Sequence, residues 1–175
     1  MAEEQPPEVK AEARQFMSDL MAAPPPEEFT GGAGADMAAW RDTFAANDNP
    51  MEKFWSIYNP SSMSIWTMVY DEADSNENLN DTVQLVKDFM KNTESLRDHC
   101  FGVMHILENL DIDGLWFFNG PDPEQLFGAN EDTSWYTWAQ LGPDANELVE
   151  KVVASILVPV DGKLNGNTIK DTQIF

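Results

Sequence analysis

Residues 99–119, HCFGVMHILENLDIDGLWFFN, decide the fold. They contain two apolar runs, at 99–107 and 115–119, separated only by the polar segment ENLDIDG at 108–114. Two strand-like runs joined by a short segment that contains Gly predict an antiparallel hairpin. The DIDG sequence within the joining segment has its Gly too early for a calcium-binding loop, so we interpret it as the turn of the hairpin.

The segments around this hairpin predict a further strand and three helices. Residues 63–70, MSIWTMVY, are apolar on both faces, as in a strand that is covered on both sides. One helix is expected from an N-cap at Asp36, and two more from the capping-box patterns Asp81 with Gln84 and Asp144 with Glu147. Residues 71–80, 120–128 and 161–167 are interpreted as loops or turns. The sequence therefore predicts an α+β domain with a small, mostly antiparallel sheet flanked by helices.

The chain of 175 residues divides into an appendage at 1–35 and a single domain at 36–175. The appendage is acidic and rich in Pro and Ala, and it ends in the flexible linker pattern GGAGA. An amphipathic helix is expected within it, and its apolar face is a candidate partner-binding surface made of Val9, Phe16, Met17, Leu20 and Met21. A helix this short is marginal alone, so it docks on its own domain or on a partner, and both alternatives stay open.

The composition limits the partners. The formal net charge is −21. Residues 1–31 contain only seven acidic and two basic residues, so most of the negative charge belongs to the domain. The electrostatic field of so many carboxylates repels nucleic acids and anionic membranes. The charge therefore favours a basic protein partner, or it serves to keep the protein soluble through repulsion between copies. The sequence has a single cysteine, no signal-peptide pattern and no apolar run long enough to span a bilayer. We therefore expect a cytoplasmic protein without membrane insertion.

A search for catalytic or metal-binding motifs gives no candidate. The acids and amides around Asp74 resemble a calcium loop, but Leu79 and Leu85 occupy the positions that need Gly and Glu. His99 and His105 would lie roughly 20 Å apart along a strand, too far to share a metal ion. Cys100 is interpreted as a buried structural residue. We therefore expect no catalytic residue, no cofactor and no metal.

The stretch EDTSWYTWAQL, residues 131–141, places Trp135, Tyr136 and Trp138 close together. These aromatic side chains form either part of the core or a stacking platform for a ligand. Their acidic neighbours, without Lys or Arg, favour the core over a nucleic-acid platform.

Several short segments together resemble one known domain. These are DMAAWRDTFAAND at 36–48, FW at 54–55, SIW at 64–66 with Tyr70, GLWFFNG at 114–120, YTW at 136–138 and KDTQIF at 170–175. In this order and spacing they resemble the C-terminal domain of the translation elongation factor 1-gamma subunit, over residues 36–175. The aromatic signature residues, expected in the core, are Trp55, Trp66, Tyr70, Trp116, Tyr136 and Trp138.

The resemblance implies a compact α/β domain with an antiparallel sheet and no catalytic residues. In that family the domain belongs to a scaffold subunit that holds the guanine-nucleotide exchange subunits of the elongation factor 1 complex. Family members carry a glutathione-transferase-like domain and a lysine-rich linker before it, where this sequence has the short acidic appendage. We therefore expect a stand-alone, acidic, divergent copy.

Three functions follow as expectations. The first is a non-catalytic scaffold or protein-interaction domain associated with elongation factor 1 subunits. The second is an accessory structural subunit of an unrelated assembly that contains a basic partner. The third is a small-molecule-binding or enzymatic domain with a cleft near Trp135–Trp138.

Overall fold

The structure, a computed structural model, describes residues 34–143 and 145–175. Its centre is a six-stranded antiparallel sheet in the order β4-β1-β3-β2-β6-β5. The strands are β1 (Ser64–Tyr70), β2 (Cys100–Leu107), β3 (Ile112–Phe118), β4 (Tyr136–Leu141), β5 (Lys163–Leu164) and β6 (Asn167–Ile174). The helices are α2 (Met37–Ala46), α3 (Pro50–Ile57), α4 (Leu79–Thr93), α5 (Glu124–Ala129) and α6 (Glu147–Leu157). The predicted α+β class, with an antiparallel sheet flanked by helices, is confirmed.

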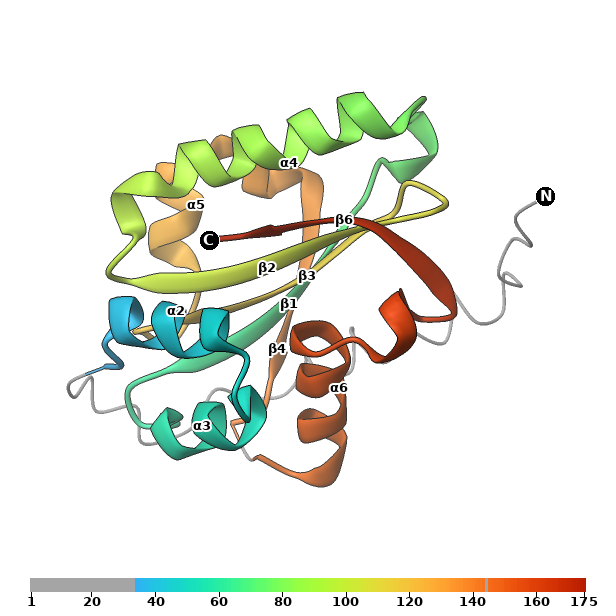
Figure 1. Cartoon of the computed structure of the whole chain (residues 1–175). Helices are drawn as coiled ribbons and strands as arrows, with labels where there is room; N and C mark the ends of the chain where they lie inside the picture. Colours follow the sequence, from blue (N-terminus) through green and yellow to red (C-terminus); the bar gives the residue numbers. More distant parts are fainter. Residues whose placement is uncertain (1–33, 144) are drawn as a thin grey trace.

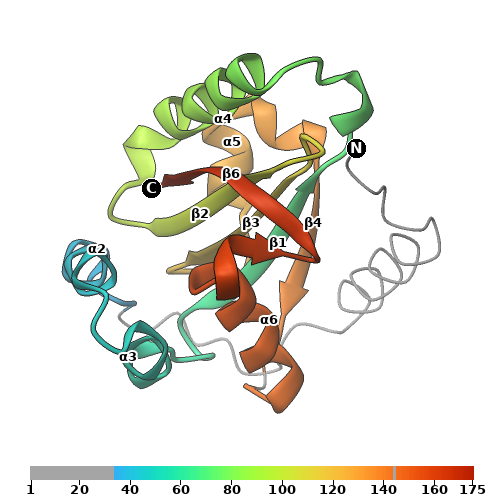
Figure 2. The ribbon, with the colours of Figure 1, turned by 45° about the vertical axis from the view of Figure 1, so that its right-hand side comes forward.

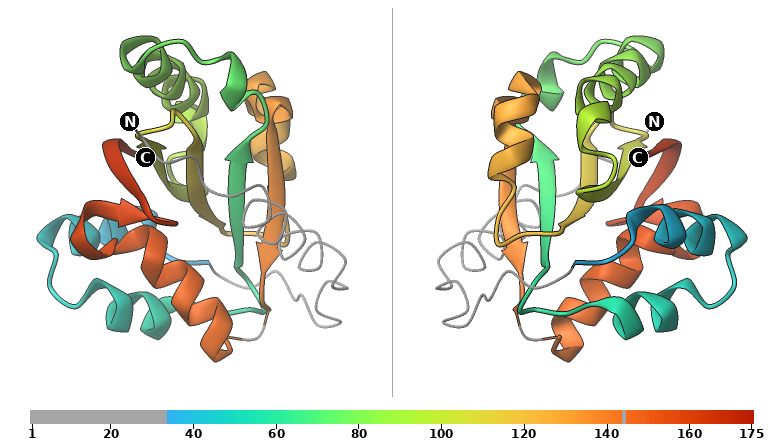
Figure 3. Two further views of the ribbon diagram at one scale, coloured as in Figure 1. Left: turned by 90° about the vertical axis from the view of Figure 1, so that its right-hand side faces the viewer. Right: turned by 90° about the vertical axis from the view of Figure 1, so that its left-hand side faces the viewer.

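Helices cover both faces of the sheet. Figure 1 shows α4 and α5 on one side and α2, α3 and α6 on the other. The side chains of β2 alternate between the two resulting cores: Phe101 and Val103 face α2, α3 and α6, whereas Cys100 and Met104 face α4 and α5. All eight residues of β2 are buried, as expected for a strand in the interior of a covered sheet. Figure 3 shows the two helical layers with the sheet seen from its sides.

The predicted hairpin is confirmed as β2 and β3, which pair from Cys100 opposite Phe118 to Ile106 opposite Ile112. Its turn places Leu110 in the left-handed region at φ 67°. The side-chain oxygen of Asn109 accepts a hydrogen bond from the backbone N–H of Asp111 at 3.1 Å, which stabilises the turn locally. The strand β1 is also confirmed, and it pairs with β3 on one side and β4 on the other.

One of the three predicted helix caps is correct. Asp36 caps α2 by accepting a hydrogen bond from the N–H of Ala39 at 3.1 Å. The caps predicted at Asp81 and Asp144 are wrong, because Asn78 caps α4 and Asn146 caps α6 in the same way. Asn and Asp are equally good N-caps, so the sequence alone does not decide between two such residues that lie within one turn of each other. In α4 the helix begins one residue after Asn78, and Asp81 lies within its first turn.

Several elements are absent from the sequence-based prediction, namely α3, α5, β4, β5 and β6. Helix α3 follows directly after α2, with Pro50 in its first turn. Helix α5 overlaps residues 120–128, for which the sequence predicts a loop; this prediction is wrong. From Ile169 onward strand β6 alternates half-buried with exposed residues, and the turn Asn165–Gly166 joins it to the two-residue strand β5. Figure 2 shows β6 beside β2, and in the strand order β6 lies between β2 and β5.

The start of the described chain is held against the domain. The backbone N–H of Ala35 donates to the side-chain oxygen of Asn119 at 2.8 Å, and the amide of Asn119 donates back to the carbonyl of Ala35 at 2.9 Å. Ala35 belongs to the GGAGA segment, so the end of this linker pattern is fixed. Among the residues described here, no helix is both long and apolar enough to cross a membrane.

Candidate functional site

The ionisable side chains do not form a metal site in the described parts of the chain, where no group of three or more His, Cys, Asp or Glu residues could hold an ion. Cys100 is fully buried, and burial raises the pKa of its thiol to about 12. A thiol with this pKa stays protonated at neutral pH and is a poor nucleophile. The interpretation of Cys100 as a buried structural residue is confirmed.

His105 is also structural. Its Nε2 atom lies 2.6 Å from the carbonyl oxygen of Ile156, and its Nδ1 atom lies 2.8 Å from the hydroxyl of Thr172. Burial lowers the pKa of His105, so the ring is neutral near pH 7. A carbonyl oxygen only accepts, so Nε2 donates to Ile156 and Nδ1 accepts from Thr172. The ring thereby connects β2, α6 and β6.

The most distinctive surface lies where α5 and the short 3-10 helix η3 (Glu131–Trp135) lead into β4. Asn130, which is buried, joins η3 to α4. Its side-chain oxygen accepts from the N–H of Asp132 at 3.0 Å, and its amide donates to the carbonyl of Phe89 and the hydroxyl of Thr93 at 3.0 and 3.1 Å. The indole N–H of Trp138 donates to the carbonyl of Thr133 at 3.1 Å. These hydrogen bonds fix the position of η3 against α4 and β4, and η3 forms one wall of a groove beside it.

A groove of about 1000 Å³ lies between this wall, α5 and the sheet. We call it the β4 groove. Its apolar floor includes Trp66, Phe127 and Trp138, and the rings of Phe127 and Trp138 meet edge to face with centroids 5.5 Å apart. Its charged lining residues are Asp122, Glu124 and Glu131, all of them acidic. Because β4 is at one end of the strand order, the groove lies beside an edge of the sheet.

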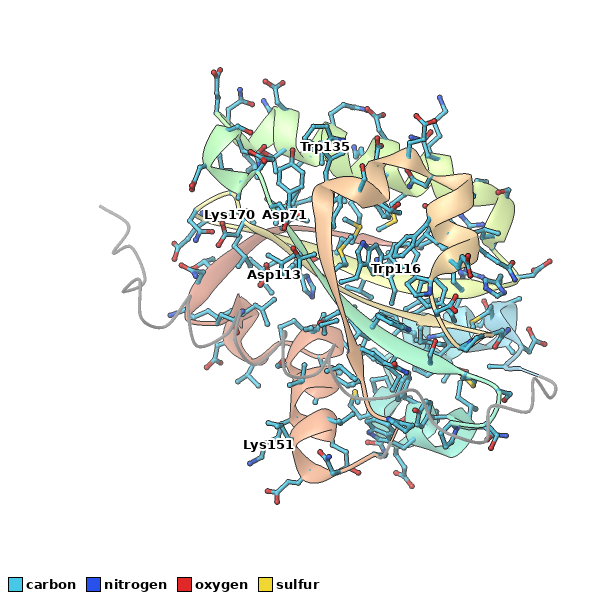
Figure 4. All side chains as sticks on the ribbon, turned by 180° about the vertical axis from the view of Figure 1, so that it is seen from behind. Asp71, Asp113, Trp116, Trp135, Lys151 and Lys170 are labelled. Carbon is cyan, nitrogen blue, oxygen red and sulfur yellow. The ribbon has the colours of Figure 1, made fainter. Side chains whose placement is uncertain are left out.

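A smaller pocket of about 400 Å³ lies on the other side of η3, between η3 and α4. Trp135 lines it and is 54% exposed, so the interpretation of the aromatic cluster as core is wrong for this residue. Tyr136 also lines the pocket, and its hydroxyl is buried without a hydrogen-bond partner in the described residues. Figure 4 shows Trp135 at the margin of the molecule beside α4, whereas Trp116 lies inside. The pocket carries three carboxylates, those of Asp81, Asp88 and Asp132.

The comparison with protein families bears on the first part of this fold. The family model "Elongation factor 1 gamma, conserved domain" matches residues 23–122. The chain belongs to this family. The match extends from before α2 to the loop after β3, and it therefore includes the hairpin from which the fold was predicted.

Curated relatives carry the same family name. The chain is 25% identical over 126 residues to "Elongation factor 1-gamma 2" of Oryza sativa subsp. japonica and 26% identical to "Probable elongation factor 1-gamma 2" of Arabidopsis thaliana. Each alignment covers 70% of this chain and 30% of the relative. The chain thus spans less than a third of the length of these elongation factor 1-gamma proteins.

The six signature aromatics of the elongation factor 1-gamma resemblance have different environments. Tyr70, Trp116, Tyr136 and Trp138 are buried on the α4 and α5 side of the sheet. Trp55 and Trp66 are half-buried, Trp55 against the rings of Phe54 and Tyr58 and Trp66 at the β4 groove. The candidate partner-binding residues Val9, Phe16, Met17, Leu20 and Met21 lie outside the described residues.

The sequence predicts a cleft near Trp135–Trp138 only as part of the third alternative function, and it does not predict the side of the β4 groove that α5 forms. Its residues Phe127 and Glu124 lie on α5, where the Pro- and Gly-containing segment predicts a loop. Of its lining residues, only Trp66 and Asp122 belong to the segment matched by the elongation factor 1-gamma model. The signal that was present in the sequence is the proximity of acidic residues, at 122, 124, 131 and 132, to aromatic residues at 127, 135, 136 and 138, a mixture typical of a partly solvated apolar surface.

Proposed function

We propose that this elongation factor 1-gamma domain is a non-catalytic protein-interaction or scaffold domain that associates with elongation factor 1 subunits in the cytoplasm. The observation that carries the proposal is the match of the family model over residues 23–122. The β4 groove supports it, because an open, apolar surface with a polar rim is typical of protein interfaces. The burial of Cys100 and His105 in structural contacts fits a domain without catalytic chemistry.

The net charge of −21 supports a protein partner rather than a nucleic acid, because binding of the phosphate backbone depends on Lys and Arg. It also favours a second candidate, an accessory subunit of an unrelated assembly that contains a basic protein. A third candidate, a small-molecule-binding or enzymatic domain, is supported only by the cavities beside Trp135 and Trp138.

The test is binding of the whole chain to purified guanine-nucleotide exchange subunits of elongation factor 1. We expect co-elution in size-exclusion chromatography near physiological salt, with a dissociation constant in the micromolar range or tighter. Co-purification from the native source at low and high salt separates the first two candidates, because the second predicts a basic partner outside the translation machinery. Lack of co-elution with any exchange subunit at either salt concentration would contradict the first proposal.

A further inference from the structure

The β4 groove is an apolar surface that the described chain leaves open. Phe127 is 42% exposed although its ring already contacts Trp138, and half-buried Trp66 extends the apolar floor. One wall of the groove is made of Thr133 and Ser134 together with residues 136–138, and these last three belong to the edge strand β4. An exposed apolar surface beside a sheet edge is a place where an extended chain can dock by side-chain burial and by strand addition.

Charge decides which chain fits there. The groove presents Asp122, Glu124 and Glu131, and the pocket across η3 adds Asp81, Asp88 and Asp132. Neither cavity is lined by Lys or Arg among the described residues. This arrangement disfavours a second copy of a chain with net charge −21, and also its own residues 1–31, which carry seven acids and two bases. It favours a segment that carries positive charge.

We propose that the β4 groove binds an extended basic segment of a protein partner. An apolar side chain of the segment lies on Phe127 and Trp138, and its Lys or Arg side chains lie against Glu124 and Glu131. The exposed ring of Trp135 lies on the other side of η3, where a further cationic side chain can stack on it. This inference rests on the proposed function, because it names the kind of partner that an interaction domain of this shape accepts.

The experiment measures binding of a labelled lysine–leucine peptide, KKLKKLKK, to the full chain by fluorescence anisotropy at about 0.15 M salt, with EELEELEE as the acidic control. The double variant Glu124→Gln/Glu131→Gln removes two exposed carboxylates from the groove. Asp42→Asn/Glu150→Gln removes the same charge from exposed positions on α2 and α6, on the opposite face of the sheet. We expect the groove variant to raise the dissociation constant about fivefold and the control variant less than about twofold.

A second variant tests the apolar floor. Phe127→Ala should raise the dissociation constant for KKLKKLKK about tenfold and that for an oligolysine peptide less than about twofold, because only the first peptide carries an apolar anchor. Both Gln substitutions are on the surface, so they report on binding even if Phe127→Ala perturbs the fold. Equal weakening by the groove and control double variants would overturn the proposal, since it would mean that the peptide follows net charge rather than the groove.

The same variants separate this inference from the proposed function. If the exchange subunits bind the wild-type chain and the Glu124→Gln/Glu131→Gln variant equally well, the groove assignment is wrong while the proposed function stands. If KKLKKLKK binds in the groove but no exchange subunit binds the chain, the association with elongation factor 1 is wrong and the groove assignment stands. Sedimentation that shows self-association lost in Phe127→Ala would identify a second copy as the occupant and would overturn the basic-segment proposal.

Discussion

At the scale of single residues, the contact between Gly102 and Trp116 shows how closely the interior is packed. Gly102 lies in β2 opposite Trp116 of β3, and a Cβ atom at position 102 would lie only 2.2 Å from the Trp116 ring. The indole can lie against the strand only because no side chain is present there. Trp116 itself is fully buried and contacts the rings of Phe89 and Phe175.

We expect Gly102→Ala to lower the free energy of unfolding by about 1–3 kcal/mol, because the added methyl group displaces a buried indole. Gly128→Ala is the matched control. Gly128 lies in α5, where an added Cβ atom would face open space, so the same methyl group should be neutral or stabilise by about 0.5–1 kcal/mol. Urea denaturation followed by Trp fluorescence measures both values. Equal stabilities for the two variants would refute the close packing described for Gly102.

At the scale of elements, the pattern of apolar residues along the sequence predicts the helices and strands that are long or strongly apolar. The β2–β3 hairpin, β1 and helices α2, α4 and α6 follow from their apolar runs and stripes. Strand β6 does not, because polar residues such as Lys170 and Thr172 interrupt its apolar pattern, and its pairing with β2 and β5 makes it a strand. Helix α5 has six residues, too few for a periodic stripe, and so the side of the groove that it forms could not be predicted.

The attachment of η3 to α4 through Asn130 leads to a prediction at this scale. Asn130→Ala removes hydrogen bonds to Phe89, Thr93 and Asp132 from a buried position, which should lower the free energy of unfolding by about 2–4 kcal/mol. It should also weaken binding in the β4 groove, because the wall would lose its fixed position. Ser134→Ala, in the same 3-10 helix, removes one exposed hydrogen bond to Glu131 and should cost less than about 0.5 kcal/mol. Thermal denaturation gives both values, and a similar cost for both variants would argue against a clamping role for Asn130.

At the scale of the whole molecule, the excess of negative charge opposes compactness. The ion pairs between described residues include Lys53–Asp48, Arg97–Glu94 and Lys151–Glu147, which are all exposed and all join residues close in sequence. Such pairs contribute at most about 1 kcal/mol each. They do not offset the repulsion among the many carboxylates of a chain with net charge −21.

Salt should therefore stabilise this protein. Raising NaCl from about 20 mM to about 300 mM shortens the Debye length and should raise the melting temperature by about 3–6 °C. Choline chloride at the same concentrations should give the same increase, since the effect is screening and not binding of a particular cation. A melting temperature that falls with salt would mean that attractive ion pairs outweigh the repulsion.

The two ends of the strand order differ in a way that limits how the molecule can assemble. One end is β4, with six residues, and the other is β5, with only two. Open-ended stacking of sheets needs two usable edges on every copy, one to offer and one to accept. Here β5 pairs with only Asn167 and Thr168 of the eight-residue strand β6, so residues 169–174 of β6 form most of this edge. Among the described strands, the sheet thus ends in two unlike edges, a short apolar and acidic margin at β4 and a longer one at β6. A growing fibre must therefore join two different surfaces, whereas like-with-like pairing through one edge ends at a dimer.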